Sequence, residues 1–172
     1  AVAAGDFFLL VGATFDDFGA TDSGAAYLFA GDTGSLAATI HNPAPAPSDH
    51  FGQAVAANAS FLAVGAPNKQ VVSIRPGQAF VYDAGGMSLW TLSSTVPQDG
   101  GEFGFSVALP AWGGGFQEVV VGAPGETVLA YPNAGQLYGF QTVDGTFLGK
   151  IENPWASHHG RFGSSIAIGR AS

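Results

Sequence analysis

"FGQAVAANASFLAVGAP", residues 51–67, decides the fold, because turn residues enclose a stretch in which apolar side chains alternate. Its landmark residues are Phe51, Gly52, Gly65, Ala66 and Pro67. Alternation is typical of strands, and proline ends a strand because it has no N–H to donate to the ladder. Glycine after phenylalanine allows close backbone approach where a strand begins. The stretch therefore predicts two short strands joined by a hairpin.

The same landmarks recur along the chain. Phe-Gly returns after 52 and then 59 residues, and Val-Gly-Ala has spacings of 53 and 57 residues. A glycine followed by a pair of aromatic residues recurs at similar spacings. The recurring landmarks are Phe103, Gly104, Gly122, Ala123, Pro124, Phe162 and Gly163. A repeat of this length is the pattern of a propeller, an array or a solenoid.

Each repeat divides into four short strands, which in the third repeat are "FGFSVAL", "QEVVVGAP", "QLYGFQ" and "FLGKIE". Four antiparallel strands per repeat match one propeller blade. We therefore predict an all-β fold, a partial β-propeller of about three four-stranded antiparallel blades plus one extra strand. The predicted bounds within a single domain, 1–172, are about 1–42, 51–95 and 103–153 for the blades and about 162–169 for the first strand of a fourth.

These motifs resemble the FG-GAP repeat family, the propeller repeat of integrin alpha subunits and of many bacterial and algal surface proteins. The resemblance covers essentially the whole chain. It implies a β-propeller at the cell surface or outside the cell. In the integrin relatives, the face that carries the long loops binds ligands, and the resemblance implies the same use of that face here.

Calcium is the point at which the chain departs from the family. Many members hold calcium in an Asp-x-Asp-x-Asp-Gly loop between the first and second strands, where closely spaced oxygen ligands suit a hard cation. Here the corresponding hairpins contain at most one acid each, Asp6 and Glu118. We therefore expect no cofactor and do not assign calcium to these hairpins.

Composition excludes several classes of partner. The 172 residues carry a formal net charge of −8 with only 5 Lys and Arg, so a basic footprint for nucleic acid or for an anionic membrane is absent from the sequence. With 0 cysteines, the chain has no disulfide and no thiolate metal site. No segment has the length of a transmembrane helix, and we expect no membrane insertion.

The long connections are expected on one face of the propeller. Strand alternation puts the connections between second and third strands on the same side as those between blades. Loops of this kind supply binding residues because they tolerate variation on a rigid scaffold. The candidate interaction residues in these connections are His50, Arg75, Trp155, His158, His159 and Arg161.

Other short patterns each have two interpretations. Asp16, Asp17 and Asp22 in "DDFGATDSG" could hold calcium, or their carboxylates could bond nearby amides as turn residues. Ser106 in "GFSVA" has some likeness to a nucleophile elbow, but the repeat aligns it with Ala54, which favours a structural position. Asn58 begins an N-glycosylation sequon, which matters only in a secreted eukaryotic protein.

The leading functional hypothesis is a non-enzymatic extracellular binding or adhesion module that presents its long loops to a protein or glycan. Two alternatives stay open, a structural subunit of a surface assembly and a propeller appended to an enzyme. Because closed propellers have about 4–8 blades, we also expect further blades as partners. Their source is either a longer chain, which we prefer on sequence grounds, or a second copy of this one.

Overall fold

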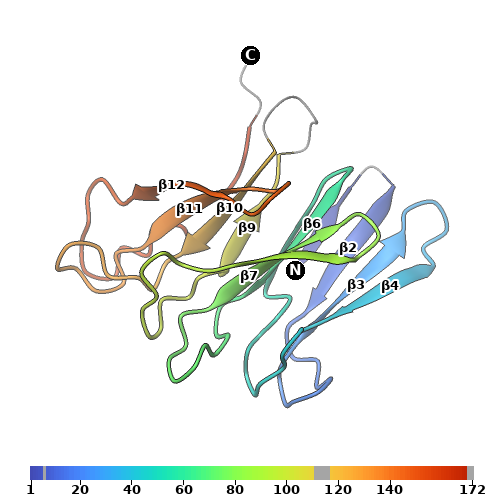
Figure 1. Ribbon diagram of the computed structural model, residues 1–172, viewed down its shortest axis with the longest axis horizontal. Coiled ribbons are helices and arrows are strands. Elements are labelled where there is room, and N and C mark those ends of the chain that lie inside the picture. The colour runs from blue at the N-terminus through green and yellow to red at the C-terminus, as the bar shows by residue number, and fades with distance from the viewer. Residues whose placement is uncertain (6, 111–116, 170–172) are drawn as a thin grey trace.

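The structure is a computed structural model that describes residues 1–5, 7–110 and 117–169. These residues form three four-stranded sheets and no helix (Figure 1), so no helix among them is long and apolar enough to cross a membrane. Blade 1 consists of β1 (Val2–Ala4), β2 (Phe8–Ala13), β3 (Ala25–Ala30) and β4 (Leu36–His41). Blade 2 consists of β5 (Ala54–Ala57), β6 (Phe61–Ala66), β7 (Gln78–Asp83) and β8 (Ser88–Leu92). Blade 3 consists of β9 (Ser106–Ala108), β10 (Glu118–Ala123), β11 (Gln136–Gln141) and β12 (Phe147–Glu152).

Every sheet is an antiparallel meander with its strands in chain order, which confirms the predicted fold of four-stranded blades. The landmarks of the repeat become cross-strand neighbours. Val64 of the Val-Gly-Ala motif lies opposite Phe80, the first aromatic residue of its pair. The corresponding pairs are Val11 with Tyr27 and Val121 with Tyr138. The sequence pattern therefore repeats once per blade, and the register of the strands repeats with it.

Phenylalanine packs at each boundary between blades. Phe51 is fully buried between blades 1 and 2, with its ring centroid 5.5 Å from that of Phe80. Phe103 is fully buried between blades 2 and 3, with its centroid 5.3 Å from that of Tyr138. Burying an aromatic side chain is among the largest single hydrophobic contributions, so these rings stabilise the blade-to-blade contacts.

Glycine is required where the Phe-Gly turn meets the preceding blade. A side chain on Gly65 would collide with the carbonyl group of Gly104, and one on Gly12 would collide with that of Gly52. The same contact joins Gly122 to Gly163. The Gly-Ala-Pro and Phe-Gly motifs therefore recur together because they are the two halves of one backbone contact between successive blades.

The prediction of a strand at 162–169 is not met, because these residues are not assigned to any strand. Phe162 and Gly163 nevertheless take the position of a blade start. Phe162 N donates to Ala134 O at 2.9 Å, as Phe103 N donates to Pro76 O at 2.8 Å. A first strand pairs with the second strand of its own blade, as β5 pairs with β6, and no strand among the described residues pairs with 162–169.

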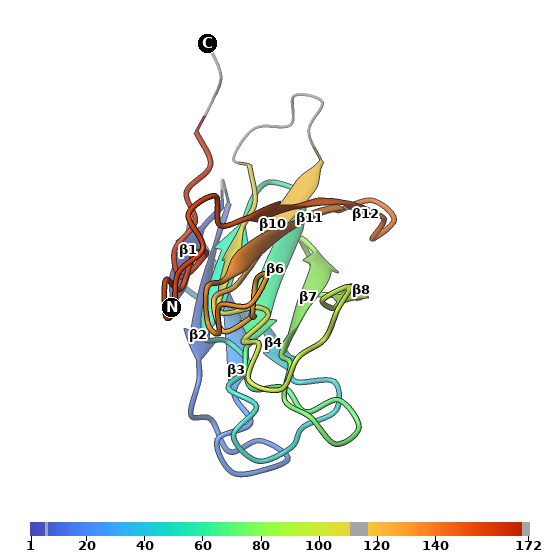
Figure 2. The ribbon, with the colours of Figure 1, turned by 90° about the vertical axis from the view of Figure 1, so that its left-hand side faces the viewer.

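The three blades fan out without closing into a ring (Figure 1). The connections β2–β3, β4–β5 and β6–β7 lie together at the lower end of the molecule (Figure 2). The short hairpin between β5 and β6 lies at the opposite end. The fold thus collects the long connections on one side, as strand alternation requires.

Candidate functional site

The long connections form a surface that we call the loop face. It consists of residues 14–24, 42–53, 67–77, 93–105, 124–135 and 153–161. Hydrogen bonds tie the connections of neighbouring blades to one another. Ser48 N donates to Thr21 O at 2.9 Å, and His159 N donates to Pro132 O at 3.0 Å. The loop face is therefore held by the same repeated bonds at each blade.

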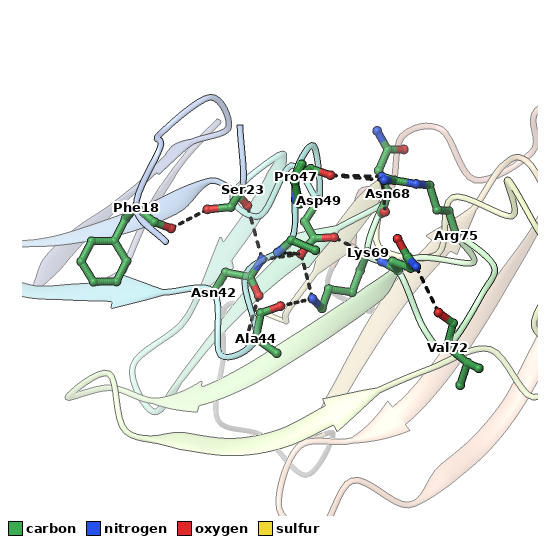
Figure 3. A network of polar contacts seen from close by, with 12 residues as sticks. Phe18, Ser23, Asn42, Ala44, Pro47, Asp49, Asn68, Lys69, Val72 and Arg75 are labelled. Atoms are coloured by element: carbon green, nitrogen blue, oxygen red, sulfur yellow. Dashed lines mark hydrogen bonds and ion pairs between the residues drawn. The ribbon is translucent and has the colours of Figure 1, made fainter. Parts of the chain in front are cut away.

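Three of the predicted interaction residues are held by partners at the blade boundaries. His50 Nδ1 and Asn68 Nδ2 lie 2.8 Å apart. The Arg75 guanidinium donates to Pro47 O at 3.3 Å (Figure 3). Arg161 pairs with Glu102 at 2.6 Å and lies over the ring of Phe105. These side chains fasten one connection to the next.

The other three predicted residues lie on the connection after blade 3. His159 Nδ1 and Asn133 Nδ2 are 3.1 Å apart, and the ring of His158 meets Tyr131 edge-on. Trp155 differs from all of these, because 87% of it is exposed. Of the six, Trp155 therefore presents the largest uncovered apolar surface.

The carboxylates in the acidic stretch of blade 1 accept hydrogen bonds from nearby residues. Asp16 accepts hydrogen bonds from Tyr27 and from Phe18 N, and Asp17 accepts one from Asp22 N at 2.9 Å. Among the described residues, no three His, Cys, Asp or Glu side chains are placed to share a metal ion. Two of these three carboxylates are thus engaged by turn and strand donors, and the calcium interpretation of Asp16, Asp17 and Asp22 stays a prediction.

The hydrogen bond between Tyr27 and Asp16 shifts the pKa of both side chains. The Tyr27 hydroxyl donates to Asp16 Oδ2 at 2.6 Å. This bond, followed by the one from Phe18 N, lowers the pKa of Asp16 below its usual range. The same bond raises the pKa of Tyr27. The folded protein therefore favours an ionised Asp16 beside a protonated Tyr27.

The hairpin between β5 and β6 is closed by the side chain of Asn58. The side-chain oxygen of Asn58 accepts bonds from Ser60 N and Phe61 N, so it closes the turn of its own hairpin. Asn58 Nδ2 donates to Pro110 O at 3.0 Å, which engages the sequon side chain as well. Asp6, the acid of the first hairpin, lies outside the described residues. In the β5–β6 hairpin, which is fully described, residues 58–60 contain no carboxylate to hold a calcium ion.

A position four residues after the Val-Gly-Ala glycine carries the main polar contacts of the loop face. It holds Asp16, Lys69 and Glu126 in the three blades. The backbone N–H of each donates to the alanine carbonyl three residues earlier, so all three occupy the same turn. We call this the turn position.

In blade 2 the turn position is half of a buried ion pair. Lys69 Nζ lies 2.7 Å from Asp49 Oδ2, and the Asp49 side chain is fully buried (Figure 3). Lys69 also donates to Ala44 O. Asp49 accepts further bonds from Asn42 Nδ2 and Ala46 N, both at 2.8 Å. These bonds satisfy the buried charges, which makes their burial tolerable.

In blade 3 the turn position is a buried acid. Glu126 accepts a bond of 2.6 Å from the Tyr138 hydroxyl and another from Gln136 Nε2. Ser94, from the connection before β9, lies 2.9 Å from the same hydroxyl. Burial, followed by the bond to Glu126, raises the pKa of Tyr138. Glu126 and Tyr138 thus join blades 2 and 3 through a hydrogen-bonded network.

Asp49, Lys69 and Glu126 were not predicted from the sequence as site residues. A signal was present in the repeat alignment, because the first aromatic residue is tyrosine in blades 1 and 3 but Phe80 in blade 2. The turn position is acidic where the aromatic residue has a hydroxyl and basic where it has none. The residue at the turn position thus changes together with the first aromatic residue of its blade, and this joint change indicates that the two positions are paired in the structure.

Two loop tips project apolar side chains from the loop face. Val71 and Ile74 pair in blade 2, and Val128 and Tyr131 pair in blade 3, so each connection ends in a two-residue turn. The first residue of each turn is Val72 or Leu129. Their φ angles are both 58°, and 92% and 84% of these residues are exposed. Positive φ is unfavourable for valine and leucine, so two blades hold the same strained, exposed apolar tip.

Comparison with known proteins places the central repeat in a family. The family model for the FG-GAP repeat matches residues 36–82. This part of the chain is an FG-GAP repeat. The matched segment begins with β4 of blade 1 and ends in β7 of blade 2, so the FG-GAP unit spans a blade boundary and includes both the Asp49–Lys69 pair and Phe51. No curated protein matches the chain.

Proposed function

We propose that this chain is a non-enzymatic binding module of the cell surface or extracellular space that holds a protein or glycan on its loop face. The observation that carries the proposal is the pair of identical strained tips, Val72 and Leu129, which expose apolar side chains in adjacent blades. Strain persists where the surrounding structure enforces it, and it is concentrated at ligand-contacting segments.

The surroundings of the tips support this use. Trp155 lies on the same face, and tryptophan is enriched at the centres of binding surfaces. Its indole can pack on a peptide or on the apolar side of a sugar ring. The polar side chains between the blades already bond one another, so they keep the tips in place. Because the loops are already held in place, little conformational entropy is lost when their apolar tips bind a partner.

The contacts of the most reactive residue types favour binding over catalysis. Ser106 Oγ donates to Gly163 O at 2.6 Å, where it joins blade 3 to the following segment. His50 and His159 each face an asparagine amide. None of these three contacts pairs a nucleophile with a base, which is the arrangement that acyl transfer requires.

The experiment compares the wild-type chain with a variant that lacks the three exposed side chains, Val72→Ser, Leu129→Ser and Trp155→Ala. The probes are a glycan array and a phage library of random peptides. The control is Met87→Ser, which removes an exposed apolar side chain from the β7–β8 hairpin outside the loop face.

We expect the wild type and the Met87 control to select the same glycans or peptides, and the triple variant to lose at least about 10-fold in affinity, since exposed aromatic anchors dominate such contacts. Equal binding by the triple variant would show that another surface is used. Absence of any selected glycan or peptide would contradict a binding module and favour a role as a subunit of an assembly.

A further inference from the structure

Three side chains that can react with one another meet in the buried network between blades 1 and 2. They are the Asn42 amide, the Asp49 carboxylate and the Lys69 amine, and the three residues are 3%, 0% and 5% exposed (Figure 3). Burial keeps out water, which would otherwise compete with the amine as a nucleophile. Because these side chains offer no exposed surface to a ligand on the loop face, the binding function does not account for their chemistry.

One oxygen of Asp49 contacts both nitrogen-bearing groups. Asp49 Oδ2 accepts a hydrogen bond of 2.7 Å from Lys69 Nζ and one of 2.8 Å from Asn42 Nδ2. The amine and the amide nitrogen therefore lie within two hydrogen-bond lengths of each other (Figure 3). A carboxylate that touches both nitrogens can take protons from one and deliver them to the other.

The Asn42 amide is held in one orientation. Its Oδ1 accepts a hydrogen bond from Ala44 N at 3.3 Å, and its Nδ2 donates to Ser23 O at 3.4 Å as well as to Asp49. The donor at Oδ1 faces the oxygen that gains negative charge when a nucleophile adds to the amide carbon. The same orientation directs the amide nitrogen, which is the leaving group of such a reaction, toward Asp49.

We propose that Lys69 and Asn42 form an amide cross-link between their side chains, with Asp49 as the proton carrier. Asp49 Oδ2 takes a proton from the Lys69 ammonium, and the neutral Nζ adds to Cγ of Asn42. Of the three ammonium protons, one stays in the new amide and two pass by way of Asp49 to the departing nitrogen, which leaves as ammonium. One C–N bond forms and one breaks, Asp49 ends as a carboxylate, and nothing is oxidised or reduced.

The boundary between blades 2 and 3 lacks these reactive groups. Ser94 stands where Asn42 stands, because Leu92 and Ile40 have the same register in their blades. The Ser94 hydroxyl accepts a hydrogen bond from Val96 N at 3.1 Å, so a serine closes this turn without an amide. We therefore expect a single cross-link, at the first boundary. The other two positions of the second boundary hold Glu126 in place of Lys69 and Gly101 in place of Asp49.

Mass spectrometry of the purified and denatured chain tests the bond. A cross-linked chain is lighter than its sequence by the mass of one ammonia molecule, and denaturation does not restore the loss because the link is covalent. Asn42→Ser removes the amide and keeps the turn, as Ser94 does, whereas Lys69→Arg keeps the charge but removes the amine. The control is Lys150→Arg, because the Lys150–Glu152 pair is exposed.

We expect the wild type and Lys150→Arg to be lighter by one ammonia, and Asn42→Ser and Lys69→Arg to have their full sequence masses. A wild type with its full sequence mass overturns the proposal, even if every variant fails to fold. The same loss of ammonia from Asn42→Ser or Lys69→Arg also overturns it, because the ammonia would then come from another asparagine or glutamine.

Peptide mapping locates the link. Trypsin does not cut after a lysine whose amine is acylated, so cleavage after Lys69 should be lost. Chymotrypsin cuts after Phe51 and Phe61, between the two cross-linked residues, so the fragments that carry Asn42 and Lys69 should stay joined. Joined fragments that are lighter by one ammonia identify the proposed bond. Fragments that are lighter by one water would instead link Lys69 to Asp49 and contradict the role of Asn42.

Asp49→Ala tests the proton transfer, because it leaves both reacting groups in the chain. We expect the cross-link to form at least about 100-fold more slowly in this variant, since a positioned general base contributes about that much. The same mass measurement follows the reaction over time, and far-ultraviolet circular dichroism checks that the variant is folded. Equal rates in the wild type and in a folded Asp49→Ala variant would exclude Asp49 as the proton carrier.

Discussion

Blade 2 carries Lys69 at the turn position, whereas blade 3 carries Glu126 there, although the backbone bonds of the two turns are the same. Lys69 pairs with Asp49, which lies two residues before Phe51. The residue two before Phe103 is Gly101, and a Cβ on it would lie 3.1 Å from Cγ of Glu126. In blade 3, Oε2 of Glu126 instead accepts a hydrogen bond from Tyr138 of its own sheet, and Oε1 is buried without a hydrogen-bond partner among the described residues.

In both blades the side chain at the turn position has a polar partner, but its charge differs between the two blades. Each solution involves two or three positions that are far apart in the sequence. A substitution at one of them is therefore expected to be costly, and a matched set is expected to be tolerated. The following variants test this expectation.

Lys69→Glu should have the largest effect, because it places a second acid beside the fully buried Asp49. Breaking a buried ion pair costs about 3–5 kcal/mol, so we expect the free energy of unfolding to fall by at least about 3 kcal/mol. Urea unfolding followed by tryptophan fluorescence measures the change. The control is Lys150→Glu, because the Lys150–Glu152 pair is exposed and should be worth about 1 kcal/mol or less.

The triple variant Lys69→Glu, Phe80→Tyr and Asp49→Gly should recover most of that loss. It gives blade 2 the acid, the hydroxyl and the glycine of blade 3, and Gln78 already stands where Gln136 stands in blade 3. We expect a recovery of about 2 kcal/mol relative to Lys69→Glu, as an acid with hydrogen-bonded partners replaces two facing acids. A triple variant no more stable than the single one would show that the two blades are not interchangeable at this position.

Tyr138→Phe should cost about 1–3 kcal/mol, because it leaves the buried Glu126 without its hydroxyl donor. The measurement is again urea unfolding, with Tyr131→Phe as the control, since Tyr131 is on the surface. Equal effects of the two substitutions would mean that the hydroxyl of Tyr138 contributes no more than an exposed one.

Tyr27→Phe should have the smallest effect, about 1 kcal/mol at neutral pH, because the Tyr27–Asp16 pair is partly exposed. The bond lowers the pKa of Asp16 from 3.8, so its contribution is present above that pH and is lost as the pH falls through the lower folded value. It raises the pKa of Tyr27 from 10.0, so the contribution is lost again as the pH rises through the higher folded value.

Unfolding experiments at several pH values check this window. The difference between the wild type and Tyr27→Phe should be largest between about pH 4 and pH 10 and should shrink on either side. A difference that is constant down to pH 2 would mean that the ionisation of Asp16 does not depend on the Tyr27 hydroxyl.

Much of the architecture was predictable from the sequence, because one chain contains three copies of the same pattern. The agreement of Phe-Gly, Val-Gly-Ala and the aromatic pair at similar spacings predicted four strands per blade and one face for the long connections. These features depend on residues within a blade or on the next blade start. Their partners therefore recur at regular distances along the chain.

The polar pairs were not predicted, since each depends on how a connection folds against a strand of its own blade or against the connection between two blades. Asp49 and Lys69 are on different connections, and the contact between Asp16 and Tyr27 joins a connection to β3. The strand predicted at 162–169, as the first of a fourth blade, is absent for a related reason. A strand requires a paired neighbour, and the pattern at 162–169 only specifies where one would begin.

The sequence by itself determined the four-stranded blades and the glycines where one blade meets the next, because hydrophobic alternation and backbone contact recur with each repeat. Only the tertiary structure decided which charges meet and which carboxylates are engaged by hydrogen bonds. Those properties depend on distances between side chains from different connections and on burial, which makes an unpaired charge costly but leaves a paired one tolerable.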